Sequence, residues 1–242
     1  MALAGSLLFW GFILVTSVLF YPVALVLRGV TFPFDGRLLL LHRFSCFWAS
    51  LYTWCNPLWS VRIEGREHID RNGTYVMVSN HQSLVDILVL FRLFVHFKWV
   101  SKAENFRIPF VGWNMTLNRY IRIERGSMRG NLSMMREAEA ALRSGSSVMI
   151  FPEGTRSSGG ALGEFKPGAF ELALRSGRPV LPIAVRGTAA ALPKKGFILR
   201  GKRAIRVCVL EPISLPWPPG TDAESLMRTV RAVIGAELGR SS

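Results

Sequence analysis

Two long apolar segments open the chain. Residues 1–27 carry no charged side chain, and Leu7–Leu27 is long enough to span a bilayer, although Pro22 interrupts it. A second, mostly apolar segment, Leu38–Trp59, is rich in aromatic side chains, which favour the membrane–water interface. We predict a helical hairpin over residues 1–59 that either crosses the membrane or lies in its surface. A helical pair buried in a soluble core is the alternative.

From about residue 60, short apolar runs typical of strands alternate with segments of helical periodicity. The predicted strands are Trp59–Glu64, Thr74–Ser79, Lys98–Ser101, Tyr120–Glu124, Ser147–Phe151, Pro179–Arg186 and Arg203–Leu210. The predicted helices are Leu84–Phe94, Met128–Arg143, Gly168–Ser176 and an amphipathic tail, Asp222–Leu238. This alternation predicts an α/β domain over residues 60–242.

The chain is both basic and hydrophobic, with a net charge of +14 and 50% hydrophobic residues. This combination favours work at an anionic membrane or on anionic substrates. The sequence carries no signature of a nucleic-acid-binding fold, so we expect no nucleic-acid partner. It has no basic signal-peptide start, and its three cysteines form no C-x-x-C pair, which favours a reducing compartment and gives no zinc or disulfide framework.

The turn from Asn80 to Asp86 places a histidine and an aspartate between a strand and a helix. On one helix, a spacing of five residues would turn His81 and Asp86 about 140° apart. With Ser83 as N-cap, however, Asp86 takes the third helical position, from which a side chain reaches back. Asp86 can then accept from one imidazole nitrogen and leave the other free as a base. The alternatives are a capping box at Asp86 and a purely structural His81.

A second turn, Phe151–Ser157, follows the strand that ends in Ile150 and Phe151. Strand ends of open α/β sheets are the usual ligand sites. In this turn, Gly154 permits a close backbone approach, and the planar fork of Arg156 suits a phosphate. The alternative is a surface turn with a Glu153–Arg156 ion pair.

Two weaker candidates are single cations at predicted strand ends. Lys102 lies just past one strand. Arg125 ends another, and by strand alternation it shares the face of Ile121 and Ile123, so it is expected to point inward. The alternative for both is a solvated charge.

Taken in this order over residues 60–215, these segments resemble the glycerolipid acyltransferases, the family of 1-acylglycerol-3-phosphate acyltransferases and their relatives. Asn80–Asp86 matches the family's first motif, Phe151–Arg156 its third and Val180–Ile183 its fourth. The second motif is matched at Arg125, but Arg119 stands where the family has glycine and Glu124 where it has aspartate. This departure bears on the identity of the acceptor more than on the chemistry.

The resemblance implies a mixed central sheet flanked by helices. It also implies transfer of a fatty acyl chain from an acyl carrier protein or coenzyme A thioester to the sn-2 hydroxyl of 1-acylglycerol 3-phosphate, which gives phosphatidic acid. His81 would be the general base and Asp86 would orient it. The expected substrate-binding residues are Lys102, Arg125, Glu153, Gly154, Thr155 and Arg156, with the cations holding the phosphate and Glu153 positioning the glycerol. We expect no metal, no cofactor beyond the acyl donor, and a location at the cytoplasmic face of a bacterial inner membrane.

Three alternatives stay open at this point. The first is the same chemistry on another acceptor, either glycerol 3-phosphate or a lyso-ornithine lipid. The second is a non-enzymatic, basic membrane-binding protein, and the third is a lipid hydrolase that uses the same pocket. An acyl-enzyme on Ser83 is less favoured than direct transfer, because the chain has no G-x-S-x-G elbow.

Overall fold

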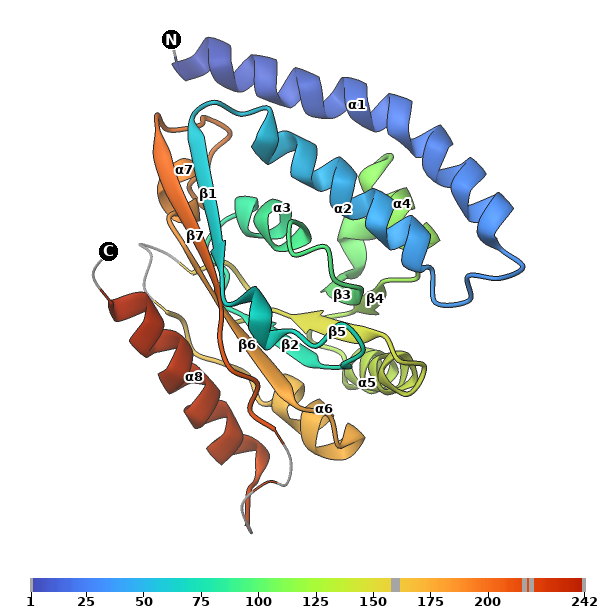
Figure 1. Ribbon diagram of the computed structural model, residues 1–242, viewed down its shortest axis with the longest axis vertical. Coiled ribbons are helices and arrows are strands. Elements are labelled where there is room, and N and C mark those ends of the chain that lie inside the picture. The colour runs from blue at the N-terminus through green and yellow to red at the C-terminus, as the bar shows by residue number, and fades with distance from the viewer. Residues whose placement is uncertain (1, 158–161, 215–216, 218–219, 241–242) are drawn as a thin grey trace.

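One seven-stranded sheet organises the protein, and helices cover both of its faces (Figure 1). The computed structural model describes residues 2–157, 162–214, 217 and 220–240. Along the sheet the strand order is β1-β7-β6-β2-β5-β3-β4. Among the seven strands of the described residues, β6 and β7 pair antiparallel and the other pairs are parallel, so the sheet is mixed, as expected. The strands are β1 (Trp59–Glu64), β2 (Val76–Ser79), β3 (Phe97–Lys102), β4 (Ile121–Ile123), β5 (Ser147–Ile150), β6 (Val180–Arg186) and β7 (Arg203–Val209).

The helices include four that the periodicity predicts and two short ones that it does not. Helices α3 (Val85–Phe91), α5 (Met128–Arg143), α6 (Gly168–Ser176) and α8 (Ala223–Gly239) lie where the pattern places them, within three residues at each end. Helices α4 (Val111–Leu117) and α7 (Thr188–Ala191) were not predicted. The chain begins with α1 (Ala2–Thr31) and α2 (Leu39–Trp54).

Parallel pairing brings the ends of four strands to one edge of the sheet. Strand β2 pairs with β5 at Val78↔Ile150, and β5 pairs with β3 at Met149↔Trp99. Strand β4 then continues the sheet beyond β3 in the same direction. The segments that follow β2, β5, β3 and β4 therefore leave the sheet from the same edge, and these are the segments that carry the predicted site residues.

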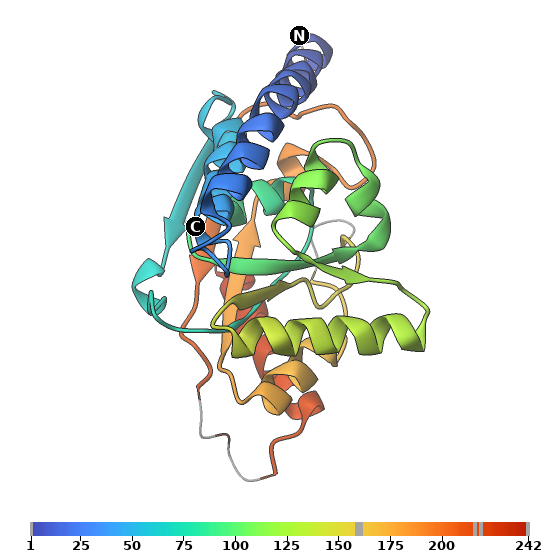
Figure 2. The ribbon, with the colours of Figure 1, turned by 90° about the vertical axis from the view of Figure 1, so that its right-hand side faces the viewer.

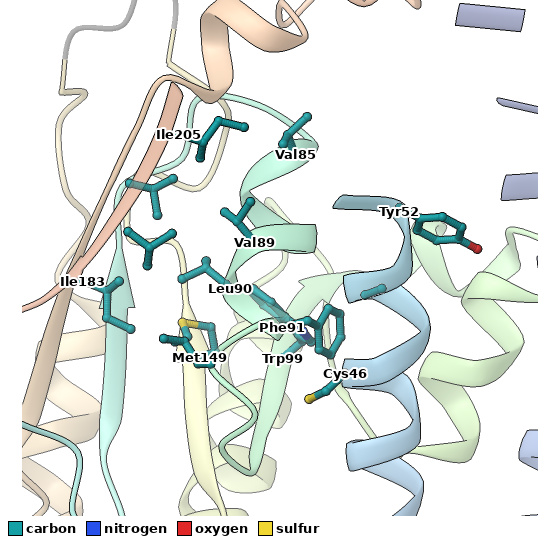
Figure 3. Packing of buried hydrophobic residues seen from close by; sticks show 14 of the residues in the cluster. Cys46, Tyr52, Val85, Val89, Leu90, Phe91, Trp99, Met149, Ile183 and Ile205 are labelled. Atoms are coloured by element: carbon teal, nitrogen blue, oxygen red, sulfur yellow. The ribbon is translucent and has the colours of Figure 1, made fainter. Parts of the chain in front are cut away.

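Hydrophobic side chains form a separate cluster on each face of the sheet. On one face, Val89 and Leu90 of α3 are fully buried between the strands and α2 (Figure 3). On the other face, α5, α6 and α8 pack together over the strands. Each fully buried aliphatic side chain contributes about 1.5–3 kcal/mol. The two clusters pack against the central strands from both sides, and the turns that carry the predicted site residues extend from these strands.

The predicted hairpin of two membrane helices needs a correction. Two helices are present, but α1 is the single described helix that is long and apolar enough to cross a membrane. The 16-residue α2 packs against α3 and buries His42, Cys46 and Tyr52, so it belongs to the protein core. The division into residues 1–59 and 60–242 stays a prediction, and α2 and the sheet share one hydrophobic cluster.

Candidate active site

The turn between β2 and α3 is clamped to neighbouring segments. The side-chain amide of Asn80 donates to the Val185 carbonyl and accepts from the Val185 N–H, both at 2.8 Å. The Ser83 hydroxyl is fully buried and donates to the Leu192 carbonyl at 2.6 Å. This hydroxyl is occupied and faces away from solvent, which argues against Ser83 as an acylated nucleophile.

His81 and Asp86 form a hydrogen-bonded pair within this turn. Asp86 Oδ2 lies 2.9 Å from His81 Nδ1, and it also accepts from the backbone N–H groups of Gln82 at 2.6 Å and Ser83 at 2.8 Å. Asp86 is fully buried, while the His81 side chain is 14% exposed. With a carboxylate at Nδ1, the Nδ1–H tautomer is favoured, and Nε2 keeps its lone pair. Asp86 therefore caps the turn and orients the imidazole at once, so the two interpretations of the sequence do not exclude each other.

The helix that follows starts one residue later than predicted. Helix α3 begins at Val85 with Leu84 at the N-cap, so Asp86 is the second helical residue and not the third. The Ser83 hydroxyl still accepts from the Val85 N–H at 3.3 Å. Asp86 reaches back from the first turn as expected, but it does so to residues that precede the cap.

Phe151 supports the imidazole from the next strand. Its ring is stacked on His81 with centroids 4.0 Å apart and planes 11° apart. Trp99 lies behind it, with centroids 5.4 Å apart. The sequence analysis did not assign this role to Phe151, because it depends on β5 lying beside β2. An aromatic residue at the end of a neighbouring strand is the signal that identifies it.

Glu153 ties the two turns together. Its Oε1 accepts from the His81 N–H at 2.7 Å and its Oε2 from the Gly163 N–H at 3.1 Å. A further bond runs from the Ser157 N–H to the His81 carbonyl at 2.7 Å. Burial raises the pKa of the Glu153 carboxyl, against these hydrogen bonds, which lower it. In this conformation Glu153 braces the backbone of His81, and its predicted contact with a glycerol stays a prediction.

The alternative of a plain surface turn at 151–157 is not supported. Glu153 is 6% exposed, and in the part of the chain that the structure describes no ion pair joins it to Arg156. Gly154 has a φ of +67°, a backbone conformation that favours glycine. A Cβ at this position would lie 3.4 Å from the end of the Lys166 side chain. The positive φ of the turn is therefore the reason for the glycine, since the distance to Lys166 is an ordinary van der Waals contact.

A pocket of about 450 Å³ opens beside this turn. Among the residues that line it are Thr155 and Arg156, both predicted, and two lysines that were not predicted, Lys166 and Lys194. Glu153 and Glu164 contribute to the same lining. Lys166 and Lys194 come from segments after β5 and β6. The sequence signal for these two lysines is a cationic residue within a stretch rich in glycine and proline.

Lys102 and Arg125 lie farther along the same edge. With strands about 4.8 Å apart, the ends of β3 and β4 are roughly 10 and 14 Å from β2. Both side chains are exposed. The alternation argument for Arg125 is wrong, because β4 ends at Ile123 and the strand geometry does not extend to residue 125. Partial desolvation by neighbouring groups lowers the pKa of Arg125 although its side chain is largely exposed, and the charge of Glu104 opposes this shift. Phosphate binding by Lys102 and Arg125 stays a prediction.

The departure at Arg119 now has a structural meaning. Arg119 joins α4 to β4 with a φ of +52°, in the left-handed region that favours glycine. A glycine, as in the family motif, would occupy this link without strain. The substitution therefore affects backbone conformation at the base of β4, and Arg119 is absent from the lining of the pocket.

Within the described residues, no group of three or more His, Cys, Asp or Glu side chains is placed to hold a metal ion. The hydrogen-bonded pair of His81 and Asp86 lies at the same sheet edge as a pocket lined by three cationic side chains, Arg156, Lys166 and Lys194.

Similarity to known proteins identifies the family of the chain. Residues 60–186 match the family model described as Acyltransferase. The chain belongs to the acyltransferase family. Its relatives in this family include the chloroplast 1-acyl-sn-glycerol-3-phosphate acyltransferase LPAT1 of Arabidopsis thaliana, 34% identical over 94% of this chain and 60% of the relative. Another is the 1-acyl-sn-glycerol-3-phosphate acyltransferase alpha of Mus musculus, 31% identical over 91% of this chain and 75% of the relative.

A relative of bacterial origin and a solved structure complete the comparison. The Pseudomonas aeruginosa 1-acyl-sn-glycerol-3-phosphate acyltransferase is 34% identical over 60% of this chain and 59% of the relative. This member of the acyltransferase family thus spans about three fifths of the length of several relatives. Its fold matches the crystal structure of the 1-acyl-sn-glycerophosphate (LPA) acyltransferase PlsC from Thermotoga maritima, with a TM-score of 0.81 and 24% identity, over 100% of this chain and 98% of that chain.

Proposed function

We propose that the protein transfers a fatty acyl chain from an acyl carrier protein or coenzyme A thioester to the sn-2 hydroxyl of 1-acylglycerol 3-phosphate, giving phosphatidic acid. The observation that carries this proposal is the His81–Asp86 pair at the same sheet edge as a pocket lined by Arg156, Lys166 and Lys194. The names of the relatives supply the acceptor and the reaction class.

The proposed reaction begins with proton transfer to His81. An alcohol is a weak nucleophile at neutral pH, and a positioned imidazole removes its proton as attack proceeds. The acceptor oxygen forms a bond to the thioester carbonyl carbon while its proton moves to Nε2 of His81. The tetrahedral intermediate then expels the thiolate, which receives the proton from the imidazolium. Asp86 stabilises the imidazolium that exists between these two steps.

The cationic pocket favours a phosphate-bearing acceptor over a lyso-ornithine lipid. Arg156 offers parallel N–H donors to a phosphate, and lysines add point charges. No described hydrogen bond or ion pair occupies the side chains of Arg156, Lys166 or Lys194 in the structure. A glycerophosphate headgroup would supply an anion for these three side chains. Both candidate donors are anionic, so the net charge of +14 suits either.

For the location, we propose that α1 lies in the surface of the membrane at its cytoplasmic face. Helix α1 exposes many large apolar side chains, among them Leu8, Val26 and Val30. It also buries Ser6 near one end and Thr31 at the other. A helix held against the domain at both ends lies along the domain surface (Figure 2), which suits an interfacial position better than a transmembrane one.

An acyl-transfer assay tests the proposal. Purified full-length protein in detergent receives a labelled acyl thioester and 1-acylglycerol 3-phosphate, glycerol 3-phosphate or a lyso-ornithine lipid. We expect transfer to 1-acylglycerol 3-phosphate, loss of transfer in His81→Ala and a raised KM for this acceptor in Arg156→Ala. Arg129→Ala, which changes an exposed arginine of α5, is the control. Transfer only to the phosphate-free lipid contradicts the acceptor assignment, and an active His81→Ala contradicts the general base.

A further inference from the structure

The segment between α7 and β7 forms a closed loop beside the site. The Arg200 N–H donates to the Ala191 carbonyl at 2.9 Å, which brings the two ends of the loop together. At its start, the Leu192 carbonyl accepts the Ser83 hydroxyl of the catalytic turn. One end of the loop is therefore fixed to the turn that carries His81.

The far side of the same loop is fastened to α1. The Trp10 indole N–H donates to the Phe197 carbonyl at 2.7 Å, and the Leu199 N–H donates to the Ser6 hydroxyl at 2.9 Å. The rings of Trp10 and Phe197 are in edge contact, with centroids 5.7 Å apart. Phe197 and Ile198 are 72% and 50% exposed, next to the apolar helix. In Figure 2 the loop passes α1 at the upper end of the molecule. Its hydrogen bonds join it to α1 on one side and to the catalytic turn on the other.

Lys194 lies within this loop and lines the pocket together with Arg156 and Lys166. Two carboxylates, Glu153 and Glu164, line the same pocket, so cationic side chains outnumber acidic ones there and an anion is favoured. Unlike Arg156 and Lys166, Lys194 belongs to a loop that is hydrogen-bonded both to α1 and to the catalytic turn. Along the chain, Lys194 lies between Leu192, which contacts the catalytic turn, and Phe197, which contacts α1.

We infer that Lys194 is a further ligand for the phosphate of the acceptor lipid. The loop between α7 and β7 places it where a phosphomonoester headgroup leaves the membrane surface for the pocket. This inference rests on the proposed function, since it assumes that the acceptor carries a phosphate. A charge-assisted hydrogen bond of this kind changes affinity by about tenfold.

Binding measured without an acyl donor tests the inference separately from turnover. The full-length protein in detergent micelles is titrated with a fluorescent 1-acylglycerol 3-phosphate and with the matching phosphate-free monoacylglycerol. Lys194→Gln should raise the Kd for the phosphate lipid about tenfold and leave the Kd for monoacylglycerol unchanged. Lys194→Arg should restore most of the affinity. Lys195→Gln changes the neighbouring exposed lysine of the same loop and is the matched control, with an expected effect below about twofold.

Three results are distinguishable. If Lys194→Gln binds the phosphate lipid as tightly as wild type does, the inference is overturned, whether or not the enzyme transfers acyl chains to that lipid. If it weakens both ligands equally, the loop has been damaged and phosphate recognition by Lys194 is refuted. If the selective loss is seen but wild type transfers no acyl chain to this lipid, the inference stands and the proposed function fails.

Discussion

Asp86→Asn separates the two roles of this carboxylate. In the wild type, Asp86 Oδ2 accepts three N–H donors, from His81 Nδ1 and the backbone of Gln82 and Ser83. Asp86→Ala removes the acceptor and leaves two buried backbone N–H groups unpaired, at about 1–3 kcal/mol each, or roughly 2–6 kcal/mol of stability. The carboxamide of Asp86→Asn keeps one oxygen for these donors and has no charge to desolvate, so its cost is only about 1–2 kcal/mol.

The effect on catalysis is expected to be much larger than the effect on folding. A neutral amide cannot stabilise the imidazolium as a carboxylate does, even with its oxygen on the same three donors. We expect kcat to fall by about 10³-fold in Asp86→Asn, equivalent to roughly 4 kcal/mol in the activation barrier. The measurements are kcat with saturating acceptor and the free energy of unfolding in urea. Glu171→Gln, an exposed carboxylate-to-amide change on α6, is the control for both.

A folded Asp86→Asn variant with kcat within tenfold of wild type would refute the orienting role. Asp86 would then be only the cap of the turn, and His81 would need no carboxylate partner. If Asp86→Asn lost as much stability as Asp86→Ala, the difference in stability expected between the two variants would be contradicted.

Three further predictions concern Lys98, Arg119 and Glu153. Burial lowers the pKa of Lys98 from 10.5 to about 8, so between these values the unfolded chain binds more protons and stability rises with pH. Between pH 8 and 10.5, the free energy of unfolding in urea should rise by about 3 kcal/mol more in wild type than in Lys98→Met. Equal pH dependence of the two proteins would contradict the lowered pKa. Arg119→Gly should raise Tm by a few degrees, because glycine relieves about 1 kcal/mol of strain at the positive φ. A lower Tm would contradict this and show that the arginine side chain stabilises the connection between α4 and β4. Glu153→Gln should cost about 1–3 kcal/mol in urea unfolding, because its NH₂ group must face a buried N–H of either His81 or Gly163. Because the pKa of Glu153 is raised in the folded protein, wild type should lose stability as pH rises through that pKa. Glu153→Gln should lack this loss, and the same pH dependence of stability in both proteins would contradict the raised pKa.

Local patterns in the sequence predicted most of the elements. The strand alternation and the helical periodicity placed all seven strands, and α5 and α6 were predicted with their observed bounds. Helix α4 was missed because it has only seven residues and begins between Pro109 and Gly112, where the composition is typical of a turn. Pro182 lies within the central strand β6, although proline is usually confined to edge strands, strand starts and bulges. In the structure it pairs with Val78, and the ladder from β6 to β7 begins one residue later, at Ile183.

Short sequence spacing predicted the pair of His81 and Asp86, and the family resemblance pointed to Thr155 and Arg156 of the pocket lining. Contacts between neighbouring strands were not predicted. The contact between His81 and Asp86 follows from one turn, so the sequence was sufficient to find it. The stack of Phe151 on His81 and the bond from His81 to Glu153 depend on β5 lying next to β2. Strand order is set by packing of the whole sheet, which no local pattern records. For the same reason, Lys166 and Lys194 were not recognised, although both line the pocket.

The position of β1 has a consequence for how the chain folds. This strand precedes β2 in sequence, yet its partner is β7, with Trp59 opposite Arg203. During synthesis from the N-terminus, β1 therefore stays unpaired until most of the protein has been made. Such distant pairing slows folding and leaves an open strand edge exposed to other chains. A chain that stops before β7 would keep β1 and one side of β6 as free edges, and aggregation of such truncated chains is the expected outcome.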